Sequence, residues 1–164
     1  MSEFLKIKSI SQLHQMIGYE NPKHALITII DYSQITGNPD HYDVKIVTDF
    51  YIISLKSPSP KSLKYGRQYY DFEEGTMMFI APDQVFSVSE FNDQIKYKGW
   101  GIYIHPDLFL NSLLGKKIKN FSFFLMLLAK LYIFPKMKEI HLPLLPKVLL
   151  KNTAETLTNL VRMF

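Results

Sequence analysis

Residues 64–88 read KYGRQYYDFEEGTMMFIAPDQVFSV, and this stretch decides the fold class. Short runs in which apolar and polar residues alternate stand on both sides of a turn around Gly75. The Pro-Asp-Gln triplet at 82–84 is a second turn signal, after which the alternation resumes. The pattern predicts β-strands over residues 63–65, 68–72, 76–81 and 85–88.

The segments on either side carry the same signals. Three further runs are rich in β-branched and aromatic residues, and they predict strands over residues 24–30, 44–55 and 96–104. The run 44–55 is long enough for one strand or for two with a bulge between them. Loop signals with Gly, Asn, Pro and Ser stand at 37–40 and 57–60. Short strands at this spacing favour a β-sandwich or a barrel.

Helices are expected before and after the strands. Residues 9–17 predict a short amphipathic helix that ends at Gly18, with Ile10, Leu13, Met16 and Ile17 on its apolar face. After the last strand, Pro106 suits a first helical position and Asp107 favours the positive end of a helix. That helix is expected to carry Leu108, Phe109 and Leu113 inward, and a second one is expected to start near Phe121.

The composition indicates one domain with its own core. The chain has 164 residues, of which 47% are hydrophobic and 14% aromatic, and this length ordinarily forms a single domain. It has no cysteine, which excludes disulfides, thiolate metal ligands and a cysteine nucleophile. The N-terminal segment MSEFLKIKSISQ has no long apolar run of the kind found in signal peptides. A cytoplasmic location is therefore expected.

The positive charge belongs to the C-terminal part of the chain. The formal net charge is +4, with an isoelectric point of about 9.1. Residues 125–164 carry six basic and two acidic residues, which leaves 13 basic and 13 acidic residues in 1–124. The first 124 residues are thus balanced in charge, and they do not have the basic character of a nucleic-acid-binding domain.

No group of residues indicates catalysis or metal binding. The histidines, at positions 14, 24, 41, 105 and 141, have no metal-ligand spacing. Asp71, Glu73 and Glu74 cluster at a turn, where neighbouring carboxylates ordinarily face solvent rather than form an acid–base pair. The sequence also has no phosphate-binding loop and no serine-nucleophile motif. We therefore expect no metal, no cofactor and no enzymatic activity.

Several segments together resemble the N-terminal sensor domain of AraC-family transcriptional regulators of the Bacteroidetes type. They are SISQLHQMIG at 9–18, HALITIIDYSQI at 24–35, DFYIISLK at 49–56, the stretch 64–88, and GWGIYIHPDLFLNSLLGKKIKNFSFF at 99–124. The resemblance covers roughly residues 5–124. It implies a mainly β fold, a cupin-like double-stranded β-sandwich (jelly roll) with a short N-terminal helix and one or two C-terminal helices. Metal-using cupins carry histidines around the corner within 64–88, and this chain has none there.

The resemblance implies a role in transcription regulation. Such regulators join the sensor to a helical dimerisation segment and to two helix-turn-helix motifs, for which this chain has no residues left, so we expect no direct DNA contact. Residues 1–124 are expected to bind an unknown small-molecule effector or to dimerise, with a second copy or with a full-length homologue, and not to bind a membrane. The alternative is a stand-alone, metal-free small cupin enzyme that acts on a sugar-like substrate.

Two groups of residues are candidates for contacting the effector. Arg67 and Tyr69 offer a cation and an aromatic ring, although the sequence favours an ordinary β-turn with strand-facing tyrosines over a ligand site here. Aromatic residues inside a cupin-like sandwich either fill the core or line a pocket, and the pocket role follows here from the resemblance alone. The candidates of this second group are Tyr51, Phe79, Phe86 and Trp100, within a wider set that includes Phe50 and Tyr103.

The last 40 residues, 125–164, depart from the family. They hold eleven of the chain's twenty leucines, together with Pro135, Pro143 and Pro146, and an interior proline costs a helix roughly 3 kcal/mol. A reading frame shifted before Leu125 can encode YAVSEALYLSEDE over 125–138, which resembles the helical segment of the family. Our hypothesis is an out-of-frame tail; a genuine but divergent, helical or irregular tail is the alternative. An intact frame at the locus, with no helix-turn-helix reading frame downstream, would exclude the frameshift.

Overall fold

The computed structural model describes residues 4–35, 44–57, 63–65, 68–70, 77–88, 98–110 and 112–118. Their strands are β1 (Phe4–Ile7), β2 (Ile27–Asp31), β3 (Lys45–Thr48), β4 (Tyr51–Ser57), β5 (Leu63–Tyr65), β6 (Gln68–Tyr70), β7 (Met77–Ile80), β8 (Val85–Val88) and β9 (Lys98–Ile104). Their helices are α1 (Ile10–Ile17), α2 (Leu113–Lys117) and the 3-10 helices η1 (Tyr32–Gln34) and η3 (Pro106–Phe109). The predicted tail, with its boundary at residue 125, lies outside the described residues.

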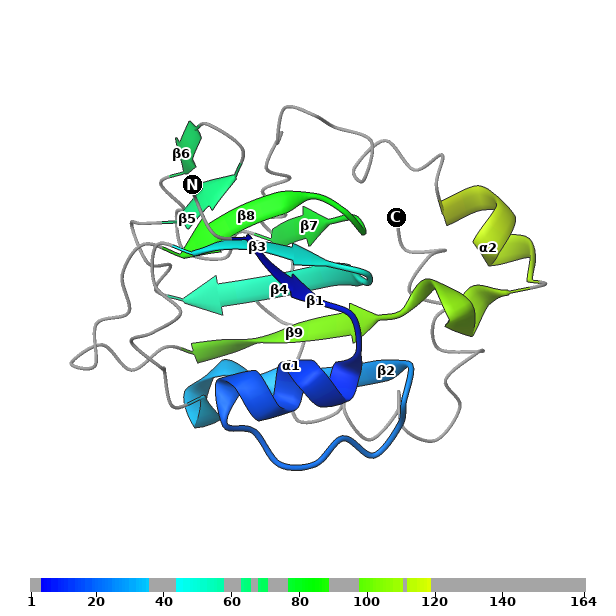
Figure 1. Cartoon of the computed structure of the whole chain (residues 1–164), viewed down its shortest axis with the longest axis horizontal. Coiled ribbons are helices and arrows are strands. Elements are labelled where there is room, and N and C mark those ends of the chain that lie inside the picture. Colours follow the sequence, from blue (N-terminus) through cyan, green and yellow to red (C-terminus); the bar gives the residue numbers. More distant parts are fainter. Residues whose placement is uncertain are drawn as a thin grey trace. The chain divides into compact units, whose positions relative to one another are not determined.

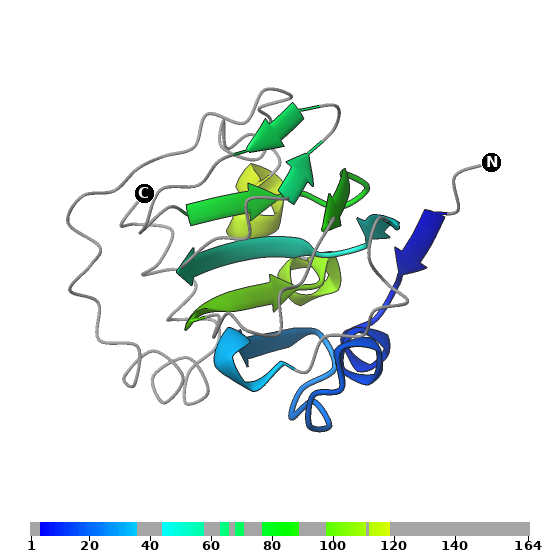
Figure 2. The same ribbon diagram turned by 90° about the vertical axis from the view of Figure 1, so that its left-hand side faces the viewer.

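The strands form two sheets, which confirms the prediction of a mainly β fold (Figures 1 and 2). One sheet has the order β1-β3-β8-β5-β6 and the other has the order β2-β9-β4-β7. The β1–β3 pair is parallel, and every other pairing among the described strands is antiparallel. The register of the long central pair β4–β9 runs from Tyr51, which is opposite Ile104, to Ser57, which is opposite Lys98.

One hydrophobic core joins the two sheets. Alternate residues of a strand point to opposite faces of its sheet. In each of the two sheets, the apolar residues of one face pack into the same cluster. The first sheet contributes Ile7 and Ile46, and the second contributes Ile30, Ile52 and Ile80. Helix α1 and the β3–β4 turn complete the cluster with Ile10, Leu13 and Phe50.

Helix α1 forms as the sequence predicts, because its start and stop signals are local. The hydroxyl oxygen of Ser9 accepts a hydrogen bond from the backbone N–H of Gln12 (3.1 Å), which caps the first turn. Gly18 ends the helix with φ of 65°, a left-handed conformation that glycine adopts without strain. Ile10 and Leu13 are buried on the inner face of the helix.

His14 is a buried polar residue on the same helix. Its Nδ1 hydrogen-bonds the backbone oxygen of Glu20, and its Nε2 lies 2.9 Å from the hydroxyl of Thr28 in β2. The ring also makes an edge contact with Tyr19 at 5.3 Å between centroids. His14 therefore ties α1 to the following loop and to the second sheet.

The structure departs from the predictions at several described segments. The sequence did not predict strand β1, and residues 115–117, which were expected to lead into a second helix, belong to α2. Of the two possibilities for the run 44–55, the structure has two strands, but they lie in different sheets instead of being joined by a bulge, because Asp49 turns the chain and donates its N–H to Ile7 O (3.1 Å). The helix expected from Pro106 is only a short 3-10 turn, in which Leu108 donates to the carbonyl of His105 (3.0 Å). Phe109 is buried there as expected, and the helix expected near residue 121 lies outside the described residues.

Replacing His14 by Phe is expected to lower the free energy of unfolding by about 2 kcal/mol, because it leaves the Glu20 carbonyl and the Thr28 hydroxyl without this partner. Urea unfolding measures the change. Gln15→Phe, at an exposed position of the same helix, is the control and is expected to stay within about 0.5 kcal/mol of the parent. Equal effects of the two substitutions would contradict a structural role for the His14 bonds.

Candidate functional site

Of the predicted ligand-contacting residues, Tyr51, Phe79 and Trp100 share one face of the second sheet. In the register of this sheet, Trp100 is opposite Leu55 and Phe79 is opposite Ile53. Tyr51, Ile53 and Leu55 alternate along β4 and therefore lie on the same face, which is the face away from the core residue Ile52. This shared face turns away from the core that the two sheets form.

The side chains of Tyr51 and Trp100 are both buried. Tyr51 contacts the ring of Phe109 in η3, with 6.3 Å between centroids and 60° between ring planes. Desolvation raises the pKa of the Tyr51 phenol.

The remaining candidates lie elsewhere. Phe86 of β8 packs against the core cluster, on the side of the first sheet that carries Ile46, its partner in the register. Tyr69 pairs with Lys64 in the β5–β6 register, but its side chain is outside the described part of the chain. Arg67 is also outside the described residues. The described candidates are therefore divided between two faces, and their contact with an effector stays a prediction.

A cluster of hydroxyl groups lies in the core between the sheets. The hydroxyl oxygens of Tyr32 and Tyr103 are 3.2 Å apart, and the Tyr32 hydroxyl also hydrogen-bonds Ser54. Tyr32 is only 4% exposed and Ser54 only 2%. We call Tyr32, Ser54 and Tyr103 the hydroxyl cluster. Its members come from η1, β4 and β9 and thus meet from three separate segments.

The walls of the hydroxyl cluster are apolar. Tyr103 contacts the ring of Phe50 edge-on, with 5.9 Å between centroids. Ile30, Ile52 and Ile80 belong to the same core cluster as Tyr32. A buried polar group in such surroundings needs a hydrogen-bonding partner, and every described buried side-chain nitrogen or oxygen has one.

Two local features bring Tyr32 into the core. Asp31 ends β2, and its Oδ1 accepts bonds from the N–H (2.9 Å) and the hydroxyl (2.7 Å) of Ser33, which turns the chain into η1. Gly101 then leaves room for the phenol, because a Cβ at this position would lie 2.2 Å from the Tyr32 oxygen. Gly101 is opposite Ser54 in β4 and Ile30 in β2.

The sequence prediction missed Tyr32 and Ser54, and it named Tyr103 only as one of a wider aromatic set. A signal was present: Gly101 stands inside a strongly apolar strand, where glycine often marks a close approach by another group. The Asp31–Ser33 spacing is a second signal, because such side chains bond the backbone two residues further on.

Both phenols are protonated at neutral pH, and burial moves their pKa values further above it. Desolvation raises the pKa of Tyr32, although its hydrogen bonds with Ser54 and Tyr103 act in the opposite direction. The pKa of Tyr103 is raised well above 10.0, mainly by desolvation. The negative charge of an ionised Tyr32 and the hydrogen bond to Tyr32 raise it further. The cluster can therefore donate and accept hydrogen bonds, but it offers no base for proton abstraction near neutral pH.

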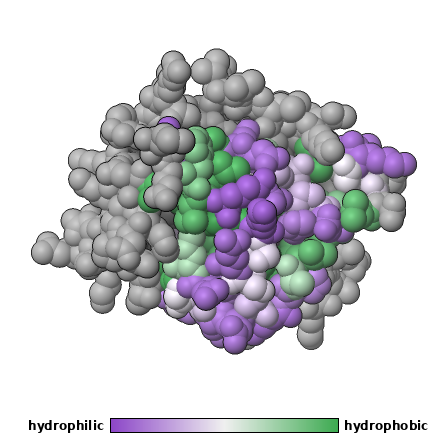
Figure 3. Space-filling model, in the orientation of Figure 1, coloured by the Kyte–Doolittle hydropathy of each residue, from purple (hydrophilic) through white to green (hydrophobic). Residues whose placement is uncertain are grey.

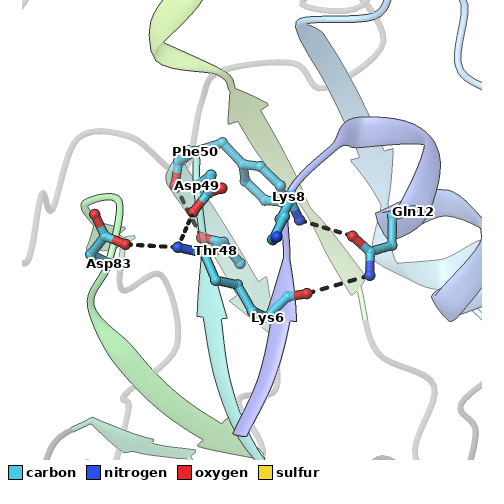
Figure 4. A network of polar contacts seen from close by, with 7 residues as sticks. All are labelled: Lys6, Lys8, Gln12, Thr48, Asp49, Phe50 and Asp83. Carbon is cyan, nitrogen blue, oxygen red and sulfur yellow. Dashed lines mark hydrogen bonds and ion pairs between the residues drawn. The ribbon is translucent and has the colours of Figure 1, made fainter.

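A separate polar network lies on the surface around Lys6 (Figure 4). The Lys6 ammonium lies 2.8 Å from Asp49 Oδ1 and 3.3 Å from Asp83 Oδ1. The hydrogen bonds to Asp49 and Asp83 raise the pKa of Lys6 above its usual 10.5. Asp83 stands at the predicted Pro-Asp-Gln corner with φ of 63° and donates its N–H to Thr48 O (2.9 Å). The network thus ties β1 to the β3–β4 and β7–β8 turns, each of which connects the two sheets.

Two classes of site are missing from the described part of the chain. It has no group of three or more His, Cys, Asp or Glu residues that could hold a metal ion. None of its helices has the length and apolar character needed to span a bilayer.

Comparison of the chain with protein-family models, with curated proteins and with solved structures found no match.

Gly101→Ala is expected to destabilise the protein by roughly 1–3 kcal/mol, because the added methyl collides with the Tyr32 phenol. Tyr32→Phe removes the atom closest to that methyl, so the double variant is expected to lose less than the sum of the two single losses. Urea unfolding of all four proteins gives the coupling energy. Strict additivity would contradict the close approach.

The hydroxyl cluster is expected to make the fold sensitive to alkali. The unfolded phenol loses its proton near pH 10.0, whereas the buried Tyr103 has a raised pKa and keeps it. Stability is therefore fully present below pH 10.0 and falls as the pH rises toward the folded pKa, by up to about 1.4 kcal/mol per pH unit for each such group. Tyr103→Phe removes one group, so its unfolding free energy is expected to fall less steeply above pH 10. Parallel curves for parent and variant up to about pH 12 would count against this assignment.

Proposed function

We propose that the chain is the sensor domain of an AraC-like transcriptional regulator and that it binds a small effector within a cupin-like jelly roll. The hydroxyl cluster is the observation that carries this proposal. Three neutral hydroxyl groups lie together in an apolar core, which is the composition of a small-molecule site: mostly apolar walls with a few polar groups that fix orientation.

The chemistry of the cluster favours a neutral, hydrogen-bonding effector. Each hydroxyl can donate one bond and accept others, so an incoming hydroxyl or carbonyl can replace the bonds that Tyr32, Ser54 and Tyr103 now make with one another. The described members of the core carry no cation or carboxylate beside this cluster. An ionised ligand would therefore lose its hydration without a compensating charge.

The same groups support binding over catalysis. The alternative of a metal-free enzyme acting on a sugar-like substrate needs a group that exchanges protons near neutral pH, and burial shifts the pKa of both phenols in the other direction. His14, the buried imidazole among the described residues, is already bonded to the Glu20 backbone and lies beside the Thr28 hydroxyl.

The cluster is also placed to pass on effector binding. Tyr32 belongs to the core cluster that contains Ile10 and Leu13 of α1, so a ligand that displaces the Tyr32 hydroxyl alters the packing surface of this helix. We propose that the domain acts in the cytoplasm, as a dimer of itself or with a full-length homologue, and that it makes no DNA contact of its own. A ligand regulates such a domain only through its differential affinity for two conformations.

Effector binding can be tested by thermal unfolding of the protein with a panel of pentoses, hexoses and neutral phenols. At least one compound is expected to raise the melting temperature. Tyr103→Phe is expected to weaken its binding by about tenfold, because one hydroxyl bond is lost. Tyr51→Phe, which removes a hydroxyl on the other face of the same sheet, is the control and is expected to bind like the parent. Conversion of a panel member to product would support the enzyme alternative instead.

Equal affinity of the parent and of Tyr103→Phe for every compound that binds would contradict a role for the hydroxyl cluster. Such a result would leave the predicted face with Tyr51 and Trp100 as the next site to test.

A further inference from the structure

Strand β1 has one open edge. It is the terminal strand of the five-stranded sheet and pairs on one side with β3, from Phe4 opposite Lys45 to Ile7 opposite Thr48. Figure 2 shows β1 at the margin of the described strands. No described strand pairs with its other side. Exposed edges of this kind are templates for pairing with another chain.

The hydrogen bonds identify which backbone groups face the open edge. The carbonyl of Ile7 accepts from Asp49 N–H and therefore faces the β3 side. Because successive residues of a strand direct their backbone groups to opposite sides, those of Phe4, Lys6 and Lys8 face outward. The bonds of Gln12 confirm this, since its amide donates to Lys6 O (3.3 Å) and accepts from Lys8 N–H (2.9 Å) (Figure 4).

Gln12 thus takes the place of a neighbouring strand over half of the edge. Its side chain reaches out from the exposed side of α1 and satisfies one carbonyl and one N–H of β1. The other half of the edge, at Phe4, has no such cover among the described residues. Phe4 is also 57% exposed, one of two large apolar side chains in the described part that are exposed.

We propose that the open edge of β1 pairs antiparallel with β1 of a second copy of this chain. A two-fold axis requires the same strand on both sides of the contact, and a register centred on Leu5 meets this condition. Phe4 of each copy then lies opposite Lys6 of the other, with the outward N–H and C=O groups of both residues bonded across the axis. The result is one continuous sheet through two copies.

The side chains on this edge suit a self-association. Lys6 already forms ion pairs with Asp49 and Asp83, so its ammonium does not approach the other copy as an unpaired charge. The Phe4 ring already contacts a lysine, since the Lys45 ammonium lies 5.2 Å from its centroid. In the proposed register Phe4 meets Lys6 of the other copy, which offers the aliphatic stem that carries its paired ammonium.

The surface around β1 is mixed. Figure 3 shows a strip of hydrophobic surface bordered by hydrophilic surface on the face of the molecule that carries β1. The contact is short, with four residues in each strand. Interfaces well below the standard size bind weakly, so the dimer is expected to form only at high protein concentration or when other contacts hold two copies close together.

Gln12 controls this association. In the dimer, Lys6 O accepts a hydrogen bond from Phe4 N–H of the other copy, so it must first lose its bond from the Gln12 amide. The bond between Gln12 and Lys8 N–H can remain in the dimer. The side chain therefore competes with the second copy for one acceptor. Removing it leaves that acceptor free for pairing, so the dimer gains stability relative to the monomer.

Sedimentation equilibrium of the full chain tests the proposal with three variants. Phe4→Pro removes an outward N–H at the first residue of the strand, a position that tolerates proline, and Phe4→Thr removes the same ring but keeps the N–H. The proline variant is expected to dimerise at least about tenfold more weakly than the threonine variant. Gln12→Ala is expected to dimerise roughly tenfold more tightly than the parent. Equal dissociation constants for the proline and threonine variants, or no dimer in either the parent or Gln12→Ala, would overturn the proposal.

Disulfide trapping tests the register. The chain has no cysteine, so Leu5→Cys introduces its only thiol, and two copies paired at position 5 place these α-carbons about 4.5 Å apart, within disulfide range. Mild oxidation is expected to give a covalent dimer with Leu5→Cys but not with the control Lys8→Cys, and the reverse result would overturn the register. These measurements do not involve the hydroxyl cluster. Dimerisation through β1 can therefore be disproved while effector binding is confirmed, and effector binding can be disproved while this dimerisation is confirmed.

Discussion

Burial of isoleucine side chains from both sheets in one core is the constraint on which the described structure depends. Ile7, Ile30, Ile52 and Ile80 come from four strands, and each is at most 2% exposed. Burying a side chain of this size contributes about 1.5–3 kcal/mol, and no strand here could bury its apolar face alone. Helix α1 adds Ile10 to the same core, which fixes the helix against both sheets.

The core also explains where the polar groups are tolerated. Tyr32, Ser54 and Tyr103 lie among these isoleucines because each finds a hydroxyl partner there, and Gly101 provides the space for the phenol. Helix α1 connects this interior to the sheet edge. Leu13 faces inward, whereas its neighbour Gln12 faces outward and bonds β1. Helix α1 therefore packs with one side on the core that holds the proposed effector site and bonds with its other side the strand of the proposed dimer contact.

Prediction from the sequence succeeded where the determining contacts are local. The helix from Ile10 was predictable because Ser9 and Gly18 stand directly beside it, and the corner at residues 82–84 was predictable from its turn residues. It failed where distant contacts decide. The placement of the two strands of 44–55 in different sheets depends on Asp49 bonding Ile7, and the hydroxyl cluster depends on three segments meeting in space. No local pattern in a single sequence carries this information, apart from the weak signal of a glycine inside a strand.

The close approach of Tyr32 to Gly101 also limits how this chain can diverge. A larger residue at position 101 occupies the volume that the phenol now fills, so such a change becomes acceptable only after position 32 has taken a smaller side chain. The order of substitutions then matters, because the reverse sequence of events passes through a strained intermediate. In a set of divergent descendants, positions 32 and 101 should vary together although they are 69 positions apart in the chain. A glycine at position 101 would then indicate that position 32 has carried a tyrosine.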